Sequence, residues 1–238
     1  MTSERVALLI ADIGGYTDYM STHRFSLAHA EVNTGRILGR MIDAAPGFDL
    51  IEIEGDAAFL SRRVDGREPD RAISEVLSAA ASMHRAFHAE REYVATNLCP
   101  CSGCKQVGNL KLKFVAHTGE VATQTIRGRL KLVGIDVIHV HRMLKNPVDI
   151  PEYVLVSDEL YRTDLTAMPT SVQEISQDLE GIGTVREYFV DVTDLDAPLP
   201  ALPAPSWRTR LGRTFTAAGL GMPYLLGLRK RRAVKTAT

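Results

Sequence analysis

An apolar strand that ends at one aspartate, and a hairpin that turns at another, most constrain the fold of this chain. Residues 6–11 read VALLIA, a short apolar run that stops at Asp12. Residues 48–54 and 57–61 predict two strands that turn at a Gly-Asp pair containing Asp56. If the first strand and the hairpin are neighbours in one sheet, the two carboxylates converge at one end of it.

Further elements follow in an order typical of a mixed fold. Helices are expected over residues 23–45, 69–91 and 136–145, and strands over 110–117, 119–133, 153–156 and 185–192, with a weaker helical stretch between the last two strands. Helices alternating with hairpin strands in this order predict an α+β domain. We expect a mainly antiparallel sheet with helices packed on one face.

The composition divides the chain into three parts. Residues 1–193 predict one domain, 194–206 form a Pro-rich linker, and 207–238 form a tail with eight basic residues and no acidic residue. The formal net charge of −1 therefore combines an acidic body with a basic tail. The acidic body argues against nucleic acid as a partner.

The tail carries a mostly apolar stretch, residues 215–228, between two groups of cations. It is too short to span a bilayer and Pro223 interrupts it, so it suits an anionic membrane surface. A tail that docks on the body, or stays disordered, is the alternative. The N-terminus lacks a basic region and a small-residue cleavage site, which predicts a cytoplasmic protein, peripherally membrane-associated if the tail binds lipid.

The two aspartates fit a divalent cation. Mg²⁺ takes one or two protein carboxylates and completes its octahedron with water and phosphate oxygens. Gly14 and Gly15, close behind Asp12, let the backbone approach a phosphate without a Cβ in the way. The alternative is that Asp12 and Asp56 are turn residues, because Asp beside Gly is common in turns.

All three cysteines, Cys99, Cys101 and Cys104, fall in one CxCxxC cluster. A cytosolic location argues against a structural disulfide. Three thiolates at this spacing suit Zn²⁺, with a fourth ligand from one of the nearby histidines. The candidate histidines are His117, His84 and His88. Redox exchange and a loop without metal remain the alternatives.

Five sequence blocks, taken in order, resemble the catalytic domain of class III adenylyl and guanylyl cyclases. They are ADIGGYT at 11–17, IEIEGDAAFL at 51–60, VAHTGEV at 115–121, GIDVIHVHRM at 134–143 and GIGTVREYFV at 181–190. The resemblance covers residues 5–192 and implies a ferredoxin-like cyclase fold. The CxCxxC insertion suggests a bacterial branch of that superfamily.

The resemblance assigns roles to individual residues. It implies that Asp12 and Asp56 bind Mg²⁺ or Mn²⁺, and that Arg142 stabilises charge at the α-phosphate. It implies homodimerisation, because such sites form between two domains. The residues expected to contact a purine nucleoside triphosphate, ATP or GTP, are Ile13, Gly14, Gly15, Tyr16, Thr17, Glu52 and Lys131.

Several positions depart from the cyclase pattern. The ribose-orienting asparagine is replaced by Ile138, and the lysines that meet the triphosphate are replaced by Glu180 and Ile182. Glu52 stands where guanylyl cyclases have glutamate, whereas Lys131 matches neither class. Glu52 is also open to a plainer interpretation, as the polar face of a strand whose Ile51 and Ile53 point inward.

Three functions are therefore compatible with the sequence. The first is a metal- and nucleotide-binding module with weak or lost cyclase activity, because each oriented donor lost typically costs ~10²–10³ in rate. The second is an active cyclase that makes cAMP or cGMP. The third is a scaffold that has kept the fold and lost the ligand.

Overall fold

A computed structural model gives the fold of most of the chain. It describes residues 3–22, 27–64, 71–97 and 106–195, together with 207, 208, 211 and 212. The cysteine cluster and nearly all of the linker and tail lie outside these residues, so the zinc, membrane and domain-boundary hypotheses stay predictions. No helix within the described ranges is long and apolar enough to cross a membrane.

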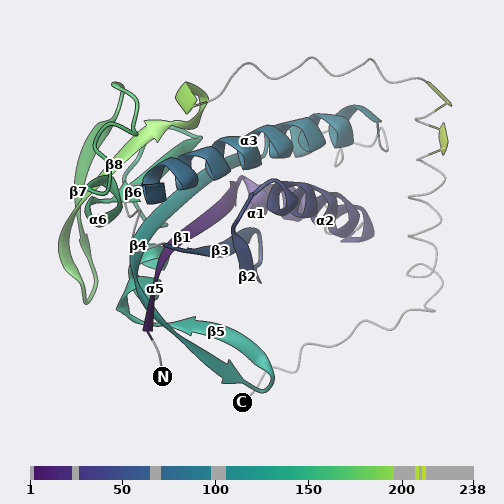
Figure 1. The fold of residues 1–238 in the computed structure, drawn as a ribbon. Coiled ribbons are helices and arrows are strands. Elements are labelled where there is room, and N and C mark those ends of the chain that lie inside the picture. Colours follow the sequence, from purple (N-terminus) through teal and green to yellow (C-terminus); the bar gives the residue numbers. More distant parts are fainter. Residues whose placement is uncertain are drawn as a thin grey trace.

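One sheet organises the domain (Figure 1). Its strands are β1 (Ser3–Gly14), β2 (Asp49–Glu54), β3 (Ala57–Arg63), β4 (Lys111–Ile126), β5 (Arg129–Val133), β6 (Tyr153–Ser157), β7 (Gln173–Leu179) and β8 (Gly183–Asp191). Their order is β2-β3-β1-β4-β6-β8-β7, and β5 pairs with β4 as a hairpin. Only the β4–β6 pair is parallel among these pairings. The prediction of an α+β fold with a mainly antiparallel sheet is confirmed.

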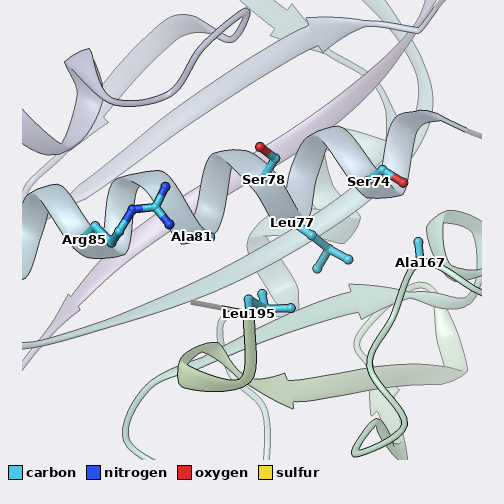
Figure 2. Close-up of a pocket in the computed structure, with 7 residues that line it drawn as sticks. All are labelled: Ser74, Leu77, Ser78, Ala81, Arg85, Ala167 and Leu195. Carbon is cyan, nitrogen blue, oxygen red and sulfur yellow. The ribbon is translucent and has the colours of Figure 1, made fainter. Parts of the chain in front are cut away.

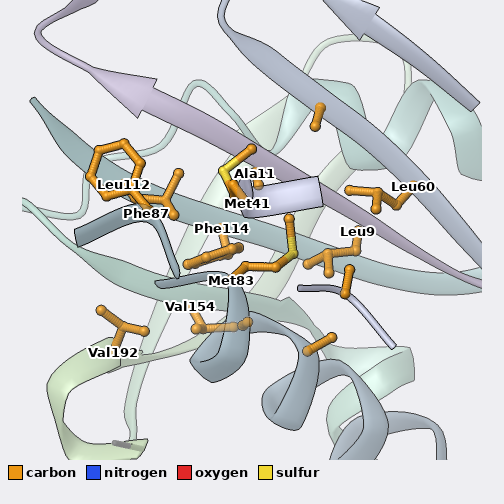
Figure 3. Packing of buried hydrophobic residues seen from close by; sticks show 14 of the residues in the cluster. Leu9, Ala11, Met41, Leu60, Met83, Phe87, Leu112, Phe114, Val154 and Val192 are labelled. Carbon is orange, nitrogen blue, oxygen red and sulfur yellow. The ribbon is translucent and has the colours of Figure 1, made fainter. Parts of the chain in front are cut away.

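The helices lie on both faces of this sheet. They are α1 (Tyr16–Thr22), α2 (Leu27–Asp43), α3 (Arg71–Asn97), α5 (Ile135–Arg142) and α6 (Asp158–Tyr161), with short 3₁₀ turns at Val107–Asn109 and Val192–Leu195. Alternate residues of β1 point to opposite faces. Leu9 and Ala11 pack with Met41 of α2 and with Met83 and Phe87 of α3 (Figure 3).

The other face of β1 is covered by α5. Leu8 and Ile10 share a second core with Val140 of α5 and with Met143, which follows it. The expectation of helices on one face is therefore wrong for α5. The short apolar stripe of α5 does not indicate, from sequence alone, which face of the sheet the helix covers.

Two other expectations need correction. Residues 173–179 form strand β7, where the sequence indicated only a weak helical stretch between β6 and β8. The helix there is the four-residue α6, and β7 is stabilised by antiparallel pairing with β8. The strands expected at 110–117 and 119–133 are instead one long strand, β4, followed by β5, because β4 pairs without interruption along all twelve residues of β1.

Gly119 of β4 allows α5 to dock. Asp136 in the first turn of α5 accepts a hydrogen bond from the backbone N–H of Glu120 at 2.6 Å and contacts His117 Nε2 at 3.1 Å. A Cβ on Gly119 would overlap the Asp136 carboxyl group. The glycine therefore fixes where α5 meets the sheet.

Buried polar side chains lie on β4, β6 and β8. His117 Nδ1 lies 2.8 Å from Ser157 Oγ, and Ser157 is opposite Glu187 in the β6–β8 register. Glu187 is fully buried and accepts a hydrogen bond from Gln177 at 2.7 Å. Burial, and secondarily the charge of Glu159, raise the pKa of Glu187 from 4.5 to about 7.

We expect Gly119→Ala to destabilise the domain by about 1–3 kcal/mol, because the added methyl group must displace Asp136 or α5. Denaturant unfolding measures the change. Gly108→Ala is the matched control, since a Cβ there meets no atom within 4 Å. Equal stabilities of the two variants would show that Gly119 does not set the position of α5.

We expect stability to depend on pH through Glu187. Its folded-state pKa lies above its unfolded value, so its contribution is fully present below about pH 4.5 and is lost as pH rises to about 7. Glu187→Gln mimics the protonated form and should gain stability relative to the wild type over that window, by at most about 3 kcal/mol. Unfolding curves at a series of pH values measure this, with exposed Glu174→Gln as the control. A difference that does not vary between pH 5 and 8 would contradict the assignment.

Candidate functional site

Asp12 and Asp56 lie together at one end of the sheet. Asp12 of β1 is opposite Ala57 of β3, which brings the preceding turn residue, Asp56, beside it. The Ile13 N–H donates to the backbone oxygen of Asp56 at 3.4 Å. Burial, and then the charge of Asp12, raise the pKa of the Asp56 carboxyl. The two carboxylates therefore repel each other at short range.

Lys113 partly balances this pair. It is opposite Asp12 in the β1–β4 register, and its Nζ lies 3.1 Å from Asp12 Oδ2. Both side chains are about a quarter exposed. Sequence reasoning missed Lys113, because only the register of β4 shows which of its alternating lysines meets Asp12.

The residues at this end fit a divalent cation. Burial and then the charge of Asp12 raise the pKa of Asp56, and a shared positive charge would stabilise both carboxylates. Such a pair leaves most positions of an Mg²⁺ or Mn²⁺ octahedron to water and phosphate oxygens. Asp12 and Asp56 would hold the ion, and Lys113 would compete with it for Asp12.

The chain leaves the sheet two residues after Asp12, where β1 ends at Gly14. Gly15 has a φ of +79°, a backbone conformation that favours glycine, and α1 begins at the next residue. Tyr16 packs partly on the core and Thr17 is exposed. Ile13 is buried, so only its main chain is available to a ligand.

Glu52 and Lys131 form an ion pair across β2 and β5. Lys131 Nζ lies 2.8 Å from Glu52 Oε2, with both side chains more than a third exposed. The two positions that the cyclase resemblance gave to base recognition are thus adjacent. The plainer interpretation of Glu52 needed Ile53 to point inward, but Ile53 is 48% exposed. The regular alternation fails because β2 has a register shift between Leu50 and Glu52.

Arg142 lies with a different group of residues. Glu180 Oε2 is 4.0 Å from its Nη1, and Gly181 in the same β7–β8 turn is also adjacent. Ile138, one helical turn earlier on α5, is 47% exposed. Within the described ranges, no recorded contact joins Arg142 to Asp12 or Asp56. One chain therefore presents two separate groups of the expected site residues.

Hollows also lie elsewhere on the surface. One of about 300 Å³ runs along α3 past Ser78 and Arg85 and is bounded across the gap by Leu195 (Figure 2). Another of about 820 Å³ is lined by residues of β1 to β5, among them Ile51 and Leu132, the chain neighbours of Glu52 and Lys131. Only the second adjoins any expected site residue.

The histidines considered as zinc ligands fall into two buried clusters. His84 and His88 face Glu152, and the His117 ring lies against the His139 ring at a tilt of 41° beside Glu159. Sequence reasoning did not single out Glu152 or Glu159, because each is distant in the chain from the histidines it approaches. Whether the cysteines come near either cluster lies outside the described residues.

Solved structures with this fold include nucleotide cyclases and a cyclase-like ATP-binding protein. The adenylyl cyclase CyaB from P. aeruginosa matches with a TM-score of 0.59 and 17% identity, over 80% of this chain and 95% of that one. A class III adenylyl cyclase-like ATP-binding protein from Pseudomonas aeruginosa matches with a TM-score of 0.55 and 15% identity, over 68% of this chain and 35% of that one. The expected class III cyclase fold is confirmed.

Sequence comparison identifies a nearer relative and a family. The uncharacterized protein Rv2561/Rv2562 of Mycobacterium tuberculosis is 36% identical over 197 residues, which cover 82% of this chain and 90% of that protein. The model of a protein family of unknown function, DUF2652, matches residues 34–153. The chain belongs to the DUF2652 family, and its fold is that of class III nucleotide-cyclase domains.

Proposed function

We propose that this chain is a cyclase-like module that binds Mg²⁺ or Mn²⁺ with a purine nucleoside triphosphate, ATP or GTP, and has weak or lost cyclase activity. The observation that carries the proposal is the pair Asp12 and Asp56 at the glycine-flanked end of β1, where burial and then the charge of Asp12 raise the pKa of Asp56. Two carboxylates in this relation favour a divalent cation, and the cation recruits phosphate oxygens.

Different residues of the chain bind the ion and the phosphates. Asp12 and Asp56 hold the ion, which neutralises the triphosphate and helps to ionise a ribose hydroxyl when it is bound. The main chain of Gly14 and Gly15 offers N–H groups to phosphate, beside the side chains of Tyr16 and Thr17, whereas the Ile13 N–H already donates to the Asp56 backbone oxygen. Their place directly after Asp12 puts these donors next to the ion.

Glu52 and Lys131 are proposed to read the purine edge. Their ion pair holds a carboxylate acceptor and an ammonium donor side by side, both partly exposed. A purine presents donors and acceptors along one edge, so such a pair can accept from one group and donate to the next. The base must replace the ion pair with its own contacts to Glu52 and Lys131. Because breaking the ion pair costs free energy, it limits the affinity for the nucleotide.

We propose a homodimer in which each site takes residues from two copies. Asp12 and Asp56 form one group on the chain, and Arg142 belongs to another with no recorded contact to them among the described residues. Ile135 and Ile138 on α5 are both about half exposed, an apolar surface beside Arg142. A second copy that covers this surface brings Arg142 of the partner subunit to the bound triphosphate.

Two features of the Arg142 group disfavour cyclisation. Glu180 is 96% exposed and lies 4.0 Å from the guanidinium, so it repels a triphosphate there. Ile138 has no hydrogen-bonding group to orient a ribose. Each lost donor typically lowers the rate by ~10²–10³. Binding at the two carboxylates does not depend on either residue.

The tail is proposed to place the module on an anionic membrane surface in the cytoplasm. Its supporting features are the cations within 207–238 and the exposed ring of Trp207, against which the Arg208 guanidinium lies at 5.5 Å. The flanking cations attract acidic lipids, and the side chains of the apolar stretch become buried in the membrane surface.

We expect wild-type protein to bind ATP or GTP in the presence of Mn²⁺, and Asp12→Asn or Asp56→Asn to weaken binding at least about tenfold, because one ligand of the ion is lost. Calorimetric titration measures the affinity. Asp49→Asn, at the exposed far end of β2, is the matched control. Unchanged affinity in both site variants, with the fold intact by circular dichroism, would overturn the site. If the wild type binds neither ATP nor GTP, a scaffold that has lost its ligand is the function that remains.

We expect the wild type to yield little or no cyclic nucleotide from the nucleotide that it binds. Ile138→Asn combined with Glu180→Lys restores two donors, and we expect it to raise product formation at least about tenfold. Leu165→Asn, which places an asparagine at an exposed apolar position outside α5, is the control. Chromatographic product analysis measures the rate. Efficient turnover by the wild type would establish the chain as an active cyclase instead.

A further inference from the structure

A second cluster of ligand-type side chains lies away from the carboxylate pair. His84 and His88 are four residues apart on α3, so both point from the same face of the helix. Glu152 directly precedes β6 and faces the two histidines. All three residues are at least about nine-tenths buried. Two histidines at this helical spacing with one carboxylate form a ligand set that zinc uses in proteins.

The distances between the ligand atoms suit one small ion. His88 Nε2 lies 2.8 Å from Glu152 Oε1, and His84 Nε2 lies 3.7 Å from Glu152 Oε2. Ligands about 2.0–2.1 Å from a tetrahedral zinc are separated by about 3.3 Å, which falls between these two values. The two imidazole rings are 4.2 Å apart between centroids. One ligand atom from each of the three residues lies within 4.8 Å of the others, so side-chain shifts would let all three bind one ion.

From this arrangement we propose that His84, His88 and Glu152 bind Zn²⁺ in the interior of the domain, with a water as the fourth ligand. The backbone N–H of Leu112 donates to Glu152 Oε1 at 3.0 Å and holds the carboxylate in place. The site joins α3 to the segment that leads into β6.

Positive charges near Glu152 oppose the binding of Zn²⁺. Lys111 Nζ lies 4.0 Å from Glu152 Oε2, and Arg91 interacts with Glu152 electrostatically. Lys111 is 43% exposed and is free to turn toward solvent. Arg91 is held by its hydrogen bond to the carbonyl oxygen of Leu110. In the absence of metal, these cations and the histidines balance the buried carboxylate.

The other histidine cluster is a weaker candidate. His117 already uses both ring nitrogens, with Ser157 Oγ at 2.8 Å and Asp136 Oδ1 at 3.1 Å. Its third member, Glu159, is half exposed. Metal binding there would break the network that positions α5.

The test separates this site from the cysteine cluster by removing the thiols. Full-length protein with Cys99, Cys101 and Cys104 replaced by serine is titrated with Zn²⁺ in competition with a chromogenic chelator. We expect one zinc per chain, and a loss of more than about 100-fold in affinity when His88→Gln or His84→Gln is added. His141→Gln is the matched control, because His141 also faces a carboxylate, Glu54, at 3.3 Å.

Thermal unfolding and cobalt provide a second readout. Zn²⁺ should raise the Tm of the thiol-free protein, because it binds only the folded state, and should not raise that of Glu152→Gln, which keeps an acceptor for the Leu112 N–H. Co²⁺ should give tetrahedral visible bands without thiolate charge-transfer absorption. The proposal is overturned if the thiol-free protein shows neither stoichiometric zinc nor a zinc-dependent Tm, or if the histidine variants bind as tightly as their parent. None of these outcomes depends on nucleotide binding.

Discussion

The pairing of β1 with both β3 and β4 is the constraint on which the rest of the structure depends. β1 is covered on both faces, so its backbone groups must be satisfied along its whole length by the two neighbouring strands. That requirement fixes the register, and the register sets Asp12 beside the turn that contains Asp56 and opposite Lys113. A slip of one residue would turn every side chain of β1 to the wrong face.

The acidic groups of the domain are held by specific partners. Asp12 has Lys113, Glu52 has Lys131, and Glu152 has two histidines together with a backbone N–H. Glu187 differs, because it forms no ion pair with a cation among the described residues and remains protonated up to about pH 7. Carboxylates that are compensated by mobile or titratable groups are suited to exchange those partners for a metal ion. A carboxyl group kept neutral by burial serves the packing of the sheet.

The fold was predictable to a large extent, and the site in part. The apolar run before Asp12, the Gly-Asp turn and the glycines define the central strands, and the cyclase resemblance supplies their order. Strand β7 could not be predicted, because its isolated pattern is weak and its stability comes from pairing with β8. The packing of α5 on the second face depends on Gly119. The sequence does not reveal this role, because it depends on the contact between Gly119 and Asp136 in the folded chain.

The sequence by itself determined which chemical groups are present and their spacing along single elements. It placed Asp12 at a strand end, Arg142 on a helix, and His84 and His88 on one helical face. Only the tertiary structure decided which of these groups meet others far away in the chain. Lys113 reaches Asp12, Lys131 reaches Glu52, and Glu152 reaches the histidine pair, because strand register and packing bring together residues between 64 and 101 positions apart. Local periodicity carries no information about such contacts, since they depend on how whole elements pack together.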